Sequence, residues 1–142
     1  MKLIYFVSYS LIILSSGAKC ETMEDFAYMW NHCIQQFPLS GDELSLMMND
    51  TYHNPSQYNN NIKCFRKCIV EQYGWFVDDV FMEDVYIQLQ ATNVLSTHID
   101  KLHEFAKECR QKGGANKCDK VHHIMYCMDS KVNKHLVSLQ EF

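Results

Sequence analysis

Apolar side chains recur every three or four residues along most of the chain beyond residue 20, the spacing that places them on one face of an α-helix. Six segments have this pattern, at about residues 22–37, 40–48, 62–72, 78–89, 97–109 and 116–128. No strand-like alternation of useful length appears between them. The pattern therefore predicts an all-α fold, a compact bundle of about six helices.

Polar residues and glycines at the ends of these segments agree with helix boundaries. Thr22 supplies a hydroxyl N-cap, and Ser40 with Glu43 forms a capping box. Gly74 is expected to end the segment 62–72, because glycine accepts the left-handed conformation that follows a helix. The next helix is predicted to begin at a cap formed by Asp78 or Asp79, and the last one at Asn116.

The spacing also predicts which side of each later helix is buried. The helix after Gly74 is expected to bury Phe81, Val85 and Leu89. The following helix has an apolar face that consists of Ile99, Leu102, Phe105, Ala106 and Cys109. The last regular helix has one that consists of Val121, Ile124, Met125 and Met128.

Beyond Ser130 the apolar residues lose a clear pattern; they are Val132, Leu136, Val137, Leu139 and Phe142. Two alternatives remain for this tail, which either folds back as the lid or wall of a pocket or forms a frayed end. Five apolar residues in a terminus of 12 residues favour docking over fraying.

The N-terminus has the pattern of a secretory signal peptide in residues 1–20. Lys2 is basic, residues 3–14 are apolar apart from two serines, and small residues follow up to Ala18. Cleavage after Ala18 or after Cys20 would each follow the small-x-small pattern of a signal peptidase site. The loss of Cys20 would leave six of the seven cysteines, an even number. We therefore expect residues 21–142 to be a single, secreted, extracellular domain.

The charge balance argues against some classes of partner. The chain has 13 basic and 17 acidic residues, and without Lys2 and Lys19 there are 11 against 17, a formal charge of −6. This balance argues against nucleic acid or an anionic membrane as the main partner. The apolar run at residues 3–14 is shorter than the ~20 residues of a membrane span, and no later segment is apolar enough, so stable membrane insertion is not expected.

Cys64 and Cys68 lie one helical turn apart, so both thiols project from one stripe of the same helix and each can reach a different neighbour. Secretion favours disulfide bonds. Cys118 and Cys127 are nine residues apart, on opposite sides of the last helix, and so cannot pair with each other. Six cysteines still leave about 15 possible connectivities, and the residues alone do not choose among them.

The cysteine spacing resembles that of the six-cysteine insect odorant-binding proteins, the pheromone-binding or general odorant-binding family. Thirty residues separate Cys33 from Cys64, three separate Cys64 from Cys68, forty follow before Cys109, and gaps of eight lead to Cys118 and Cys127. The segments CFRKCIVEQYG (64–74) and KCDKVHHIMYC (117–127) are similar to the central and closing segments of that family. The likeness covers nearly all of the expected mature chain.

The resemblance implies the disulfide bonds Cys33–Cys68, Cys64–Cys118 and Cys109–Cys127 around an internal apolar pocket. It implies a carrier that solubilises small hydrophobic ligands such as odorants or pheromones, without catalysis, metal or cofactor. A membrane chemoreceptor is a further candidate partner, and the expected oligomeric state is a monomer or a weak homodimer.

Aromatic and flexible apolar side chains near the helix junctions are the candidates for the pocket wall. They are Trp75, Phe76, Phe81, Leu89, Leu102, Ile124, Met125 and Val137. Met47 and Met48 are also predicted to face inward, where flexible thioethers suit varied ligands. The alternative for each residue is an ordinary place in a filled core.

Histidines are candidates for a pH switch that releases ligand on acidification, because histidine titrates near neutrality. They lie on or beside the elements that would close a pocket or gate the tail, and are His98, His103, His122 and His123, with His135 in the tail. The alternative is that most of them are solvated surface residues.

Asn49 begins the sequon Asn-Asp-Thr and is a candidate glycosylation site in a loop predicted at residues 50–61. A zinc site at Cys64, Cys68 and the His122–His123 pair is disfavoured by the cysteine spacing and by secretion. Two rival functions remain. A scavenger of biogenic amines or lipids on a similar fold would, for amines, need a carboxylate facing the pocket, and a protein-interaction module would have a filled core.

Overall fold

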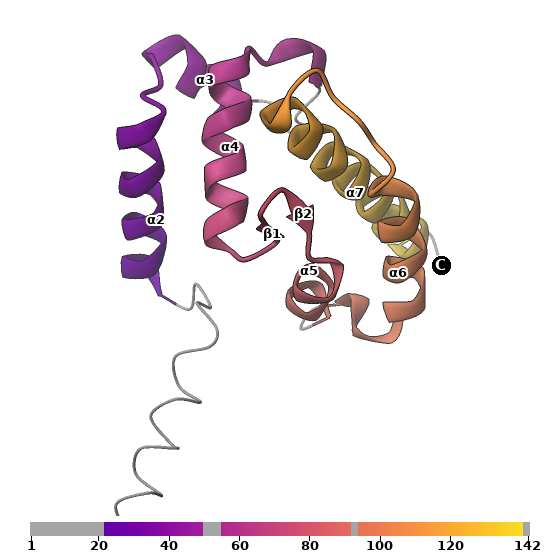
Figure 1. Cartoon of the computed structure of the whole chain (residues 1–142). Coiled ribbons are helices and arrows are strands. Elements are labelled where there is room, and N and C mark those ends of the chain that lie inside the picture. The colour runs from indigo at the N-terminus through magenta and orange to yellow at the C-terminus, as the bar shows by residue number, and fades with distance from the viewer. Residues whose placement is uncertain (1–21, 50–54, 92–93, 141–142) are drawn as a thin grey trace, which may run out of the picture.

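The computed structural model describes residues 22–49, 55–91 and 94–140, and its architecture is helical, as predicted (Figure 1). The described residues form six α-helices, which are α2 (Met23–Gln36), α3 (Gly41–Asn49), α4 (Asn60–Gln72), α5 (Glu83–Gln90), α6 (Ile99–Cys109) and α7 (Lys117–Gln140). Single 3₁₀ turns lie at Pro55–Gln57 and Val94–Thr97. None of the helices in these ranges has the length and apolar character needed to cross a membrane.

The first two described helices begin at the predicted caps. The Asp25 backbone N–H donates to Thr22 Oγ1 at 3.2 Å, and the Thr22 N–H donates to the Asp25 carboxylate at 3.3 Å. The Glu43 N–H donates to Ser40 Oγ at 3.2 Å, and the Ser40 N–H donates to the Glu43 carboxylate at 2.7 Å. Each pair satisfies two amides that a helix start leaves without partners.

Helix α4 begins two residues before the predicted Ile62, because Asn59 is its N-cap and accepts the Ile62 N–H at 3.0 Å. The chain leaves the helix through Gly74, whose φ of +74° favours glycine, as predicted. The part of the predicted loop that lies within the described residues therefore contains a 3₁₀ turn and the start of α4.

A short β-hairpin replaces the predicted start of the next helix. Strands β1 (Phe76–Val77) and β2 (Val80–Phe81) are antiparallel, with Phe76 opposite Phe81. Asp78 and Asp79 have φ values of +50° and +64°. Two successive positive φ values produce the tight turn that matches the twist of a hairpin, so these residues turn the chain and do not cap a helix.

The predicted buried face of α5 is wrong. Val85 and Leu89 are 40% and 44% exposed, whereas Tyr86 and Ile87 are buried. The hairpin moves the start of the helix to Glu83, and the Tyr86 ring packs edge-on against Trp75 with centroids 5.0 Å apart. In α6 the predicted face is buried except for Ile99, which is 40% exposed at the first turn.

Helix α7 extends without a break through the predicted tail to Gln140. It contains neither glycine nor proline, and Val132 and Leu136 continue the spacing of Val121, Met125 and Met128. Val132 is buried and Leu136 packs against the core, while Val137 is 55% exposed. The described tail therefore docks against the core through Val132 and Leu136, as a continuation of α7 and not by folding back, and Phe142 lies outside the described residues.

Helix α4 stands between α2 and α7, and α6 lies along α7 (Figure 1). The larger core cluster joins the end of α4, the hairpin, α5, α6 and α7. A smaller cluster joins α2, α3 and α4 around Cys33, Phe65 and Cys68. The core thus has two parts that share α4.

Candidate functional site

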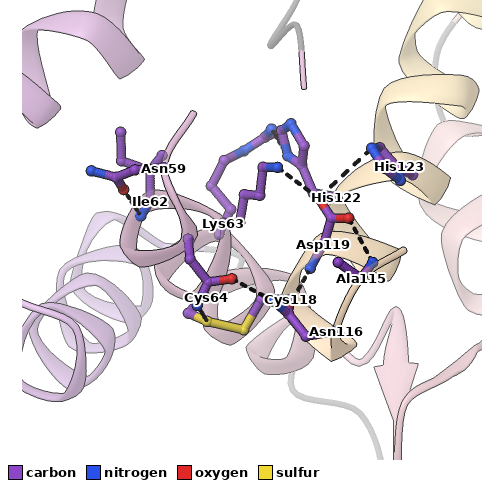
Figure 2. A network of polar contacts seen from close by, with 12 residues as sticks. Asn59, Ile62, Lys63, Cys64, Ala115, Asn116, Cys118, Asp119, His122 and His123 are labelled. Carbon is purple, nitrogen blue, oxygen red and sulfur yellow. Dashed lines mark hydrogen bonds and ion pairs between the residues drawn. A yellow bond between two sulfur atoms is a disulfide. The ribbon is translucent and has the colours of Figure 1, made fainter. Parts of the chain in front are cut away.

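The junction of α4 and α7 is held by covalent and polar contacts (Figure 2). The Cys64–Cys118 disulfide joins the two helices, and Lys63 Nζ lies 2.6 Å from the Asp119 carboxylate. The Asp119 carboxylate also accepts the Ala115 N–H at 2.8 Å, and Asn116 Oδ1 accepts the Asp119 N–H at 3.0 Å, so Asn116 is the cap of α7, as predicted. The hydrogen bonds from Lys63 and from the Ala115 N–H lower the pKa of Asp119 below its usual range.

Three disulfide bonds connect the helices in the pairs that the resemblance implies. Cys33–Cys68 ties α2 to α4, and Cys109–Cys127 ties α6 to α7. Together with Cys64–Cys118, they make α4 and α7 the frame to which the other helices are attached. The largest loop that they close spans 54 residues, between α4 and α7.

Six of the eight candidate wall residues meet in the larger core cluster. They are Trp75, Phe76, Phe81, Leu102, Ile124 and Met125. Phe76 and Phe81 pack with ring centroids 5.2 Å apart, and Tyr86 lies 5.8 Å from Phe81. The hairpin, α5, α6 and α7 therefore surround one aromatic and aliphatic region.

Leu89 and Val137 do not belong to this region. Leu89 is 44% exposed on α5 and Val137 is 55% exposed on α7, so neither is a wall residue in this structure. Met48 is 81% exposed, which corrects its predicted inward position, whereas Met47 packs in the smaller cluster. In α5 and in the tail these errors follow from the shifted helix start and from the extension of α7.

A small cavity lies between α4 and α7 beside this region. Its volume is about 10 Å³, and its lining includes Arg66, Val70, His122 and Met125. Such a volume holds at most one water molecule. An odorant-sized pocket within the core therefore stays a prediction, and a ligand would have to displace side chains such as Met125.

A titratable residue, Asp129, lies beside the same region and was not predicted from the sequence. Asp129 lies on α7 at helical intervals from Met125 and Val132, which are both buried, and is itself half-buried. Burial raises its pKa to about 6, although the charge of Arg66 opposes that rise. Burial also raises the pKa of Tyr86, and the negative charge of Asp129 adds to that effect. Helical spacing would have placed Asp129 inside had α7 been expected to continue past Ser130.

The candidate histidines occupy different environments. His122 is buried, and its Nδ1 lies 2.8 Å from the Arg66 guanidinium. The half-buried His123 has Nδ1 2.7 Å from the Gly113 carbonyl oxygen. The ring of His98 lies 4.9 Å from that of His135, and His103 is exposed. The structure therefore does not bring the predicted switch histidines into one cluster.

Asn49 is the last residue of α3 and is exposed, so the predicted sequon begins at a helix end. The other two sequon residues lie outside the described residues. Glycosylation of Asn49 stays a prediction.

Three comparisons with known proteins agree with this architecture. The model of the PBP/GOBP family matches residues 17–131. General odorant-binding protein 56a of Drosophila melanogaster is 26% identical over 98 residues, which are 69% of this chain and 66% of that protein's length. The solved structure of the fatty acid binding protein OBP56a from the oral disk of the blowfly Phormia regina has a TM-score of 0.61 and 26% identity, over 80% of this chain and 96% of that one.

The family match covers most of the chain and includes all six cysteines of the three disulfide bonds. Helix α4 carries two of these cysteines, and α7 receives bonds from both α4 and α6. The chain therefore belongs to the PBP/GOBP family, the pheromone-binding and general odorant-binding proteins.

Proposed function

We propose that this protein is a secreted carrier of small hydrophobic ligands, which it holds between the hairpin, α5, α6 and α7. The observation that carries the proposal is the convergence of six of the eight candidate wall residues on one apolar region of a PBP/GOBP fold. The structurally similar blowfly protein is a fatty acid binding protein by name, which supports a ligand of this kind. Odorants, pheromones and similar semiochemicals are the ligand class.

Transfer of the ligand from water drives binding, at about 25 cal/mol per Å² of apolar surface removed from water. The core must open to admit the ligand, since the cavity beside Met125 measures about 10 Å³. The flexible Met125 side chain is the group best suited to move aside. The Cys64–Cys118 disulfide bond holds α4 and α7 together while the interior rearranges.

Asp129 and Tyr86 orient the ligand's polar group. Near neutral pH the Asp129 carboxyl is mainly ionised, since its pKa is about 6. An ionised carboxylate on the inward face of α7 accepts hydrogen bonds from an alcohol or attracts an amine. This observation also supports a second candidate function, the capture of amines, because that role requires an interior carboxylate.

Acidification releases the ligand in this proposal. The Arg66 guanidinium can only donate, so His122 accepts with Nδ1, and protonation of that nitrogen breaks the contact and brings two cations together. The Tyr58 ring lies 5.2 Å from His122, and the His123 ring lies 6.4 Å away. Protonation of Asp129 below pH about 6 also removes its attraction to Arg66.

The proposal is tested with the oxidised protein, an environment-sensitive apolar fluorophore and displacement by long-chain alcohols, carboxylates and amines. Saturable uptake with displacement is the expected result. Met125→Trp should reduce uptake several-fold by filling the opening, whereas Met48→Trp on the exposed face of α3 should not. Circular dichroism establishes that both variants fold, and Met125→Phe gives a milder change at the same position. No uptake by the folded protein would contradict the carrier function.

The ligand class and the release step are tested in the same assay. If amines are the ligands, Asp129→Asn should lower the affinity for amines roughly tenfold and change the affinity for neutral alcohols by no more than a factor of about two. Displacement by alcohols alone would exclude amine capture. Affinity that stays constant from pH about 7 to pH about 5 would exclude release by acid.

A further inference from the structure

An open groove lies on the outer side of α7, away from the apolar region described above. Its volume is about 420 Å³, large enough for a small organic molecule. One long wall is a stripe of α7 that includes His123, Tyr126, Ser130 and Lys134, at successive intervals of three or four residues. Lys112, in the segment that follows α6, forms the opposite side.

The groove is positively charged, although the chain as a whole has a formal charge of −4. Lys112, Lys131 and Lys134 line it, and no acidic residue does. The Glu108 carboxylate lies 2.5 Å from Lys131 Nζ, and the charge of Lys112 also helps to lower the pKa of Glu108. Within the described ranges, neither Lys112 nor Lys134 takes part in an ion pair. Lys134, and Lys112 despite its longer-range attraction to Glu108, can thus contact an anion.

The rest of the lining is suited to an apolar body next to that anion. The Tyr126 ring and Cys127, which is bonded to the fully buried Cys109, contribute apolar surface, and the Tyr126 and Ser130 hydroxyls are hydrogen-bond donors. His123 bonds through Nδ1 to the Gly113 carbonyl oxygen at 2.7 Å, which fixes the segment after α6 against α7. Asp119 lies 3.7 Å from His123 Nε2 but does not line the groove.

We propose that this groove is a second binding site of the protein, which takes small amphipathic carboxylates from solution. The carboxylate contacts Lys112 and Lys134, and the apolar body lies over Tyr126 and Cys127. The site is independent of the interior site and does not depend on whether that site opens.

The test is a titration of ¹⁵N-labelled oxidised protein with octanoate and, separately, with octan-1-ol, which has the same chain length and no charge. Octanoate should shift the amide signals of Tyr126, Ser130 and Lys134, and octan-1-ol should not. Raising the salt concentration from about 0.1 M to about 1 M should weaken these octanoate shifts, because the screening length falls from about 10 Å to about 3 Å.

Charge-reversal variants identify the contact. Lys134→Glu should weaken octanoate binding at the groove roughly threefold, and Lys112→Glu combined with Lys134→Glu roughly tenfold. Lys107→Glu is the matched control, because Lys107 is exposed on α6 and does not line the groove. Displacement of the apolar fluorophore by octan-1-ol reports the interior site and should be the same in all three variants.

Several results would overturn the second site. Octanoate shifts confined to Trp75, Leu102 and their neighbours would place all binding in the interior. Equal octanoate affinity in Lys134→Glu and Lys107→Glu would exclude the lysine contact. Equal shifts of the groove signals by octan-1-ol would show that no anion is recognised there. If the protein took up no fluorophore but octanoate still shifted the amide signals of the groove, only the proposed interior carrier site would be contradicted.

Discussion

Asp129 occupies an environment that carboxylates usually avoid. It is half-buried on α7 between Met125 and Val132, and burial raises its pKa to about 6 from an ordinary value of 3.8. The folded protein therefore retains this proton over a window between pH about 4 and pH about 6, in which the unfolded chain has released it. The contribution of Asp129 to the free energy of unfolding is therefore highest below this pH window and falls as the pH rises through it.

Asp129→Asn should raise the free energy of unfolding at pH 7 by about 2–3 kcal/mol, because the amide carries no charge that must be buried. The dependence of stability on pH between about 4 and 6 should flatten. Urea denaturation at pH about 4.5 and at pH about 7 measures both effects. Asp100→Asn, at an exposed position of α6, is the control. A loss of stability in Asp129→Asn at pH 7 would instead mean that the carboxylate forms a favourable pair with Arg66.

Two leucines that the sequence analysis treated alike differ in burial. Leu102 is 0% exposed on α6, and Leu89 is 44% exposed on α5. Leu102→Ala should lower the free energy of unfolding by about 2–5 kcal/mol, whereas Leu89→Ala should cost about 1 kcal/mol or less. Thermal denaturation compares the two variants. Equal losses would contradict the orientation that the structure gives to α5.

At the scale of elements, the hairpin between α4 and α5 determines where the aromatic side chains lie. Its turn brings Phe76 opposite Phe81, and Met82 N–H donates to the Trp75 carbonyl oxygen at 2.8 Å. Asp79 in the turn lies 3.1 Å from Lys67 Nζ and 2.6 Å from Lys117 Nζ. These ion pairs connect the turn to α4 and to the start of α7, and the bonds from Lys117 and Lys67 lower the pKa of Asp79.

Substitution of Asp78 tests the turn conformation, because the φ of this residue is +50°. Its side chain is exposed, so the substitution removes no buried contact. Asp78→Val should destabilise the protein by about 1–2 kcal/mol, since a β-branched residue is strained in that conformation. Asp78→Gly should change stability by less than about 1 kcal/mol. Chemical denaturation of both variants provides the measurement. A valine variant as stable as the glycine variant would exclude the left-handed turn.

At the scale of the whole molecule, α2 is joined to the rest of the fold by one disulfide bond and the smaller core cluster. Helix α2 contacts α4 through the smaller cluster, whereas α4, α6 and α7 share the larger one. Cys33–Cys68 closes a loop of 35 residues, and such a cross-link contributes roughly 3–4 kcal/mol in the chain-entropy account.

Replacing both Cys33 and Cys68 with alanine should therefore release α2 and leave the larger core folded. Amide hydrogen exchange should accelerate in Met23–Gln36 and remain slow in the buried part of α7. The matched change at Cys109 and Cys127 should accelerate exchange in α6 instead. Exchange that accelerates uniformly in the first variant would mean that the two clusters unfold as one unit.

Much of the local structure was predictable because it depends on neighbours in the sequence. The caps at Thr22, Ser40 and Asn116 bind amides three residues away, so their residue types alone indicate a helix start. Helical spacing placed Leu102 and Ile124 inside, and they are 0% and 1% exposed. The cysteine spacing indicated the family, and the disulfide pairs agree with that resemblance.

The remaining features depend on contacts between distant segments. Two consecutive aspartates serve as a helix cap or as a hairpin turn, and the pairing of Phe76 with Phe81 and the ion pairs of Asp79 favour the turn. The inward side of α5 depends on Trp75, and the inward position of Asp129 depends on the continuation of α7 across the core.

The sequence by itself determined the helical class, most helix starts and the six cysteines that become cross-links, because each follows from spacing along one chain segment. Only the tertiary structure decided which face of α5 is buried, the burial that raises the pKa of Asp129, and the meeting of Lys112 with Lys134 across a groove. Burial and long-range electrostatics depend on which surfaces face each other in space, and spacing along the chain does not specify that arrangement.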